Sequence, residues 1–215
     1  MERSCMGERY LGCGSKGEEI ILNGTPGNAL GAYLDGSNIV VNGNAQDAMG
    51  DTMNAGSITV HGGTGDACGY AMRGGEIYVR DSVGYRAGIH MKAYKEKLPV
   101  LVIGGRAGSF LGEYQAGGLI IVLGLGFEGK GVVGYFCGTG MHGGKIYLRT
   151  DTEPQDLPEQ VMVSEATEED MQAIDRYINS YCDKFNVEKS VIENSKFYVL
   201  TPNTKNPYKR LYCYN

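Results

Sequence analysis

Residues 69–80 read GYAMRGGEIYVR, and residues 138–149 read GTGMHGGKIYLR. The two segments share glycine, methionine, a Gly-Gly pair, isoleucine and tyrosine at the same relative positions. The match indicates an internal repeat, and glycines extend it at a spacing of 19 residues: Gly12, Gly31, Gly50, Gly69 and Gly88. Gly112 and Gly138 continue the series after intervals of 24 and 26 residues. A fixed period of this length is typical of a solenoid.

Apolar residues recur in step with these column glycines. Isoleucine stands eight residues after the glycine, and leucine or valine ten residues after it: Ile20/Leu22, Ile39/Val41, Ile58/Val60, Ile77/Val79, Ile120/Val122 and Ile146/Leu148. Residues two apart in a strand face the same side, so each copy predicts one short strand with an inward face. The copy after Gly88 reaches its matching pair, Val100 and Val102, four residues late, because of an insertion around Ala93–Leu98. A second insertion, of seven residues, falls within 124–138.

The period selects one fold class. Nineteen residues is too short for a strand–helix–strand crossover of about 30 residues, but it suits one coil of a parallel β-helix. Glycine-rich corners allow the positive φ or close backbone approach that such a coil needs. A β-propeller blade needs about 40 residues, a leucine-rich repeat needs 20–29 with another leucine pattern, and collagen needs glycine at every third position. We therefore predict an all-β fold, a single-stranded right-handed parallel β-helix of about seven rungs over residues 1–150.

The chain changes character at Asp151. All 34 glycines precede this residue, and the last 65 residues contain none. We predict that 151–215 forms a linker, a helix and a C-terminal extension. Glu153–Glu159 carries two prolines and acidic residues, which is typical of a linker. The chain closes with an aromatic and basic stretch at 206–215 (NPYKRLYCYN). We expect this tail to fold back on the β-helix as a cap or to dock on a partner.

One helix and one strand are expected in the tail. Thr167 followed by Asp170 resembles a capping box, with Asp in place of Glu. An apolar face then follows at helical spacing: Met171, Ile174, Ile178, Tyr181 and Phe185. Lys196–Thr201 (KFYVLT) has the composition of a strand.

The repeat columns account for most of the candidate reactive residues. Cys68 and Cys137 share a column with leucine, methionine and alanine, so we expect both thiols in the core. His61 and His142 occupy polar columns, and His90 lies near the first insertion. Because none of these histidines is paired by sequence with a nucleophile, acyl-transfer chemistry has no support. We predict no catalytic, cofactor-binding or metal-binding residue.

Three further patterns have simpler explanations. Residues 124–129 (GLGFEG) fit G-x-G-x-x-G, but a dinucleotide site needs a helix to begin there, and the sequence continues without helical period. Met53, Met72, Met91 and Met141 share a column with Leu34, which predicts an internal ladder. The acidic run at 168–170 suits a helix N-terminus. Paired carboxylates for glycoside hydrolysis occur in β-helices, but no pair stands out here.

Composition excludes several classes of partner. Hydrophobic residues make up 42% and charged residues 21%, as in a globular protein. The net charge of −5 and the absence of a basic cluster argue against nucleic acid or an anionic membrane. Apolar runs are too short for a membrane span, and Met1–Tyr10 lacks the pattern of a signal peptide, so we expect a cytoplasmic protein. The six cysteines show no C-x-x-C pair and no zinc-ligand spacing, which favours reduced thiols.

Two stretches carry a resemblance to a known family. Residues 27–80, with GNALGAYLDGSNIVVNGNAQDAMG and GTGDACGYAMRGGEIYVR, and 119–148 (LIIVLGLGFEGKGVVGYFCGTGMHGGKIYL) resemble the Gly-rich C-terminal β-helix domain of the glutamate synthase large (alpha) subunit. The resemblance covers about 15–150 and, more loosely, the tail. It includes the rung pattern and the insertion before the last rung. One of the subunits of formylmethanofuran dehydrogenase has a related β-helix, which makes that family the nearest competitor.

The resemblance implies a structural role. In the long glutamate synthases this domain follows a glutamine amidotransferase domain and an FMN barrel, and this chain contains neither. Cys5 has no amidotransferase context, and the cysteine cluster that binds iron–sulfur is absent. The chain thus resembles a free-standing version of the domain in a split glutamate synthase. FMN and iron–sulfur are then expected in partner subunits, the FMN-domain and amidotransferase chains, with NADPH or ferredoxin as electron donor.

Two alternatives stay open beside this hypothesis. One is the scaffold of a formylmethanofuran dehydrogenase-like complex, and the other is an independent β-helix protein that binds or converts a small molecule. Self-association is also compatible with the sequence, since stacked faces of a β-helix can pair.

Overall fold

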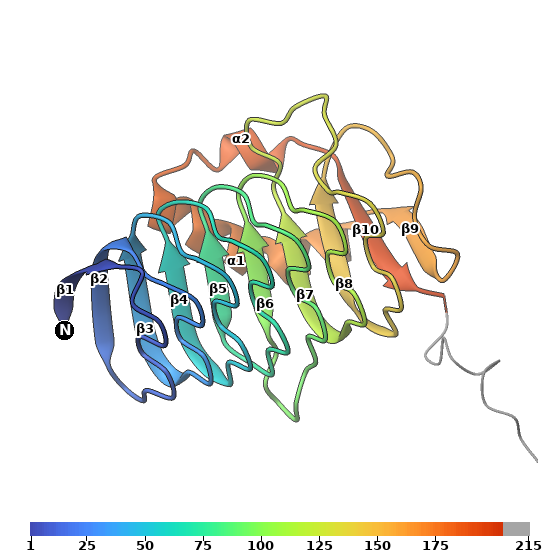
Figure 1. Ribbon diagram of the computed structural model, residues 1–215. Helices are drawn as coiled ribbons and strands as arrows, with labels where there is room; N and C mark the ends of the chain where they lie inside the picture. Colours follow the sequence, from blue (N-terminus) through green and yellow to red (C-terminus); the bar gives the residue numbers. More distant parts are fainter. Residues whose placement is uncertain (204–215) are drawn as a thin grey trace, which may run out of the picture.

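The structure, a computed structural model, describes residues 1–203. Its repeat region is a stack of coils, each of which contributes one strand to a common parallel ladder (Figure 1). The strands are β1 (Glu2–Met6), β2 (Glu19–Thr25), β3 (Asp35–Asn42), β4 (Ala55–Val60), β5 (Glu76–Val79), β6 (Val100–Ile103), β7 (Ala116–Val122) and β8 (Gly143–Arg149). The seven repeat copies form β2 to β8, and six turns of the chain connect them. The predicted parallel β-helix is confirmed.

The apolar columns pack inside the coils as expected. Ile39 pairs with Ile58 and Ile58 with Ile77, in one ladder of identical residues. All three side chains are fully buried, and so are those of the valine column beside them. On another side of the coil, single parallel bridges link Ala45 to Thr64 and continue in the same way up to residue 133. The interior is therefore a continuous apolar column closed by backbone hydrogen bonds.

One predicted register is wrong by one residue. Ile77 pairs with Leu101 and Val79 with Ile103, so the inward pair comes five residues late, not four. The five residues equal the excess of the 24-residue interval over the 19-residue period. Val100 and Val102 instead face the opposite side of the sheet, because a shift of one residue exchanges the two faces of a strand. The insertion itself lies where it was expected, and Tyr94 and Lys97 form an antiparallel bridge within it.

The corner around each column glycine uses left-handed backbone at two further positions. Ala48 (φ 55°) and Thr52 (φ 53°) flank Gly50 (φ 70°), and every repeat copy has the same pattern. The N–H groups of Ala48 and Thr52 donate to carbonyls of the following coil at 2.8 and 2.7 Å, whereas that of Gly50 donates to the preceding coil at 2.8 Å. Each inner corner is thus bonded to both neighbouring coils in the stack.

The tail continues the same sheet and covers part of its outer face. It consists of β9 (Val161–Glu165), α1 (Glu168–Phe185), α2 (Ser190–Glu193) and β10 (Phe197–Pro202). β10 pairs antiparallel with β8, and β9 pairs antiparallel with β10, so the sheet ends in the order β8-β10-β9. The expected strand at 196–201 is β10, whereas β9 and α2 were not predicted. The closing stretch 206–215 lies outside the described residues.

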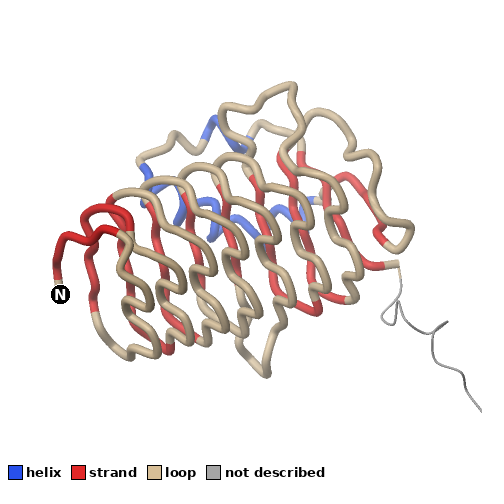
Figure 2. Tube along the Cα trace, in the orientation of Figure 1, coloured by secondary structure: helices blue, strands red, loops and turns tan. Residues whose placement is uncertain are grey.

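Helix α1 lies across the outer face of the strands (Figure 2). Its start is the expected capping box, in which Thr167 and Asp170 exchange side chain-to-backbone hydrogen bonds. It ends at Asn186 in a left-handed conformation. Its apolar face joins outward residues of the last four parallel strands in a second core, which contains Tyr78, Val102, Ile121, Tyr147, Ile174, Ile178 and Tyr181. The described part of the tail therefore folds back on the β-helix.

Candidate functional site

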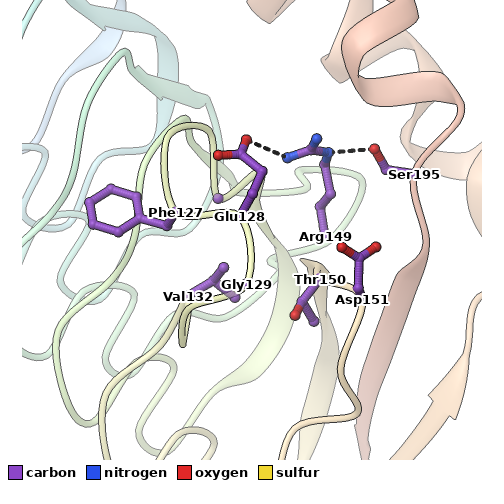
Figure 3. A pocket seen from close by; sticks show the side chains of 9 residues that line it. Phe127, Glu128, Gly129, Val132, Arg149, Thr150, Asp151 and Ser195 are labelled. Carbon is purple, nitrogen blue, oxygen red and sulfur yellow. Dashed lines mark hydrogen bonds and ion pairs between the residues drawn. The ribbon is translucent and has the colours of Figure 1, made fainter.

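Arg149 is the centre of a polar cluster at the end of β8 (Figure 3). Its Nε donates to Ser195 Oγ at 2.7 Å. Nη1 donates to the Leu123 carbonyl at 2.9 Å, and Nη2 donates to the Val191 carbonyl at 3.1 Å. Glu128 Oε1 lies 3.7 Å from Nη1, and the arginine side chain is only 11% exposed. The guanidinium therefore ties the second insertion, the end of the solenoid and the tail to one another.

The cavity beside Arg149 is small. The cavity lined by Gly124, Phe127, Glu128, Gly129, Val132, Arg149, Thr150, Asp151 and Ser195 measures ≈ 30 Å³. This is about the volume of one water molecule. No helix begins in 124–131, so the G-x-G-x-x-G segment lacks the N-terminus that would hold a pyrophosphate. As expected, this motif forms a loop.

The cysteines of the apolar column are core residues. Cys68 and Cys137 are fully buried, and burial raises the pKa of each thiol to about 12. A thiol with such a pKa forms almost no thiolate near neutral pH, so neither is a nucleophile. Desolvation by burial also raises the pKa of Cys5 and of Cys182. Cys13 is exposed, and the five described cysteines are free.

Two of the three histidines lie against aromatic rings. His61 packs edge-on against Phe185 of α1, with ring centroids 5.1 Å apart, and burial lowers its pKa. His90 stacks on Tyr114 at 5.2 Å with 10° between the ring planes. Within residues 1–203, no three His, Cys, Asp or Glu side chains form a group that could hold a metal ion.

The methionine column contains one fully buried polar residue that the sequence pattern did not reveal. Gln115 stands three residues after Gly112, in line with Met91 and Met141, and its side chain is fully buried. Its amide nitrogen donates to the carbonyls of Gly117 and Gly118 at 3.4 and 3.2 Å. The pairing of β7 with β8 is irregular at this point, so the amide compensates for the local loss of ladder hydrogen bonds. Its role is therefore structural.

Asp170 in the acidic run at the start of α1 belongs to the docking of the helix. Its Oδ1 accepts a hydrogen bond from Lys145 of β8 at 2.6 Å, and its Oδ2 accepts from Thr167. Burial alone would raise the pKa of Asp170, but the hydrogen bonds from Lys145 and Thr167 outweigh burial and lower it. Tyr147 also lies within 3.5 Å of Oδ1. Sequence spacing could not reveal this contact, because 25 residues separate Lys145 from Asp170.

The side chains of Arg149, Asp170, Cys68 and Cys137 thus take part in the packing of the fold, and other side chains are exposed at the coil corners. Aromatic rings gather there in the last four coils, with Tyr85 40%, Phe136 55% and Tyr135 73% exposed. None of the helices in the described part of the chain is long and apolar enough to cross a membrane.

The model of the GXGXG motif family matches residues 4–203, which is nearly the whole chain. This protein belongs to the GXGXG motif family. A domain of this family is found in the large subunit of glutamate synthase. The GXGXG chain is also 48% identical over 133 residues to "Uncharacterized protein MJ1350" of Methanocaldococcus jannaschii. That match covers 59% of this GXGXG chain and 51% of the relative, so the match spans about half the length of the relative.

Proposed function

We propose that this GXGXG chain is a non-catalytic structural subunit of a split glutamate synthase, which makes glutamate reductively from glutamine and 2-oxoglutarate. The family match over 4–203 carries the proposal, because the whole described chain then corresponds to a domain of the large subunit. Its side chains support a structural role. Arg149 and Asp170 are engaged in joining elements of the fold, and the thiols of the apolar column are buried.

The proposed role is to hold the FMN-domain and amidotransferase subunits in place. A stack of coils bonded to one another at every corner is suited to this role, because it resists bending and sliding. With about 4.8 Å between neighbouring strands, the ladder from β2 to β8 spans roughly 30 Å. In this proposal the partner subunits bind FMN and iron–sulfur and contain the site of reduction. The complex is placed in the cytoplasm.

Reconstitution tests the proposal. The GXGXG chain, the FMN-domain subunit and the amidotransferase subunit from the same genome are purified separately and mixed, with one omitted each time. We expect glutamine-dependent glutamate formation to require all three, and the three to co-elute in size-exclusion chromatography. Full activity without the GXGXG chain, in a mixture whose thermal stability is unchanged, would refute the structural-subunit role.

A further inference from the structure

A groove opens at the β8 end of the stack, between two loops that the fold brings together (Figure 1). One wall is the second insertion at 129–135, and the other is the linker between Thr150 and Leu157. The groove measures ≈ 560 Å³, which lies within the range of small-molecule sites in proteins. Arg149 is not part of its lining. The groove therefore has room for a small molecule beside the cluster already described.

Both walls of the groove are anchored to the solenoid. On the insertion side, the N–H of Gly134 donates to the Ala107 carbonyl at 3.1 Å. On the linker side, the N–H of Thr150 donates to the Lys196 carbonyl at 3.1 Å, and Leu157 packs against the main apolar core. Because the fold holds both walls, the groove is formed before any ligand binds, and this lowers the cost of binding.

The two walls carry opposite charges that do not meet. Arg106 and Lys130 line the insertion side, and Glu153 and Asp156 line the linker side. All four residues are exposed, and none of them forms an ion pair with another residue of 1–203. The guanidinium of Arg106 lies over the ring of Phe127, 5.4 Å from its centroid, and a ring face does not neutralise its charge. Two cations and two carboxylates therefore line the groove without being paired by the fold.

This pattern of charge distinguishes between classes of ligand. A simple anion such as phosphate would be repelled by the carboxylates of the linker, and a simple cation would be repelled by the arginine and the lysine. A free α-amino acid carries a carboxylate and an ammonium group on the same carbon, so it can pair with both walls at once. Val133 and Leu157 are half-buried in the lining and offer apolar contact to the methylene groups of its side chain.

We propose that the groove binds a free L-α-amino acid, with its carboxylate on Arg106 and Lys130 and its ammonium group on Glu153 and Asp156. The site is additional to the proposed structural role and does not depend on it. Only the choice among amino acids rests on the proposed function, under which glutamine and glutamate are the amino acids that the assembled enzyme consumes and makes.

Ligand binding by the purified full chain tests the inference. Thermal denaturation is followed in the presence of each of the common L-amino acids, glutamine and glutamate included, since a ligand that binds the folded state raises Tm. Calorimetry then measures Kd for the amino acid that stabilises most and for its N-acetyl derivative and its methyl ester. These derivatives lack the positive and the negative charge of the α groups, respectively. We expect each derivative to bind at least about tenfold more weakly than the parent amino acid.

Two variants test the two walls separately. Lys130→Gln removes a cation and Glu153→Gln removes a carboxylate, and the fold should be unaffected because both residues are exposed and unpaired within 1–203. Lys92→Gln and Glu159→Gln are the matched controls, since these exposed residues do not line the groove. We expect each groove variant to bind the amino acid at least about tenfold more weakly and each control to match the wild type. Glu153→Gln should also reduce the difference between the amino acid and its N-acetyl derivative, which a purely structural effect would not do.

The contrary outcomes are distinct from a failure of the proposed function. Equal binding by the wild type and both groove variants would place the ligand elsewhere and overturn the inference. Stabilisation by inorganic phosphate and by none of the amino acids would make the groove an anion site, and no stabilisation by any amino acid would overturn the inference as well. Each of these results leaves the reconstitution experiment unaffected. Amino-acid binding by a chain that the reconstituted enzyme does not need would instead support the site and refute the structural-subunit role.

Discussion

Replacing Gly50 by alanine should destabilise the solenoid through two separable effects. The residue has φ 70°, and a Cβ at this position would lie 2.5 Å from Ile77 Cδ1 in the following repeat copy. A left-handed L-residue costs roughly 1–2 kcal/mol. Overpacking adds about 1–3 kcal/mol, because Ile77 is fully buried and has to shift. We expect Gly50→Ala to lower the free energy of unfolding by about 2–5 kcal/mol, measured by urea denaturation followed by circular dichroism.

Two further variants separate these effects. Gly14 has a similar φ, 65°, but nothing lies within 4 Å of its Cβ position, so Gly14→Ala should show the backbone cost of about 1–2 kcal/mol alone. Ile77→Val removes the clashing methyl group and by itself costs about 0.5–1.5 kcal/mol. In the double variant with Gly50→Ala, that deletion should recover about 1–2 kcal/mol. Equal costs at Gly14 and Gly50, together with no coupling to Ile77, would refute the steric argument.

Three other predictions concern single side chains. Arg149→Lys should lose the forked hydrogen bonds and cost about 2–4 kcal/mol, with faster proteolysis of the tail as the readout and an unchanged cleavage rate as the contrary result. The pKa of Asp170 is lowered in the folded protein, so its ionised carboxylate stabilises the fold above the unfolded pKa of about 3.9, and this stability is lost as the pH falls through the folded pKa. Asp170→Asn should therefore reduce the loss of stability at acidic pH, measured by denaturation at a series of pH values. The same loss in the variant and the wild type would contradict the role of the carboxylate. Iodoacetamide at about pH 8 should label Cys13 in the native protein but Cys68 and Cys137 only after denaturation, as mapped by mass spectrometry; native labelling of a buried thiol would show that the core opens.

The sequence revealed the interior of the solenoid because each inward position is repeated. Ile39, Ile58 and Ile77 stack on one another, so the need for an apolar side chain at this position recurs at a fixed spacing in the sequence. At the first insertion the repeat no longer indicated which residues face inward. Four apolar residues in a row at 100–103 gave no alternation to fix the face, and the register was therefore placed one residue off.

The outer contacts were harder to predict, because each occurs once. The strand alternation of β5 to β8 does place Tyr78 and Tyr147 on the outer face, which was a signal that something covers them. Nothing in the spacing linked Lys145 to Asp170 or Arg149 to Ser195, since these pairs depend on how α1 and α2 lie on the sheet.

The antiparallel pairing of β10 with β8 has a consequence for how proteins of this kind change length. A coil can be duplicated or deleted inside the stack, since a unit of 19 residues returns every column to its place. At the β8 end, however, the next strand runs in the opposite direction, so no further coil can join the parallel ladder there. Insertion or deletion of whole coils is therefore confined to the amino-terminal side of β8. The tail stays attached to the last coil and does not change with the number of coils.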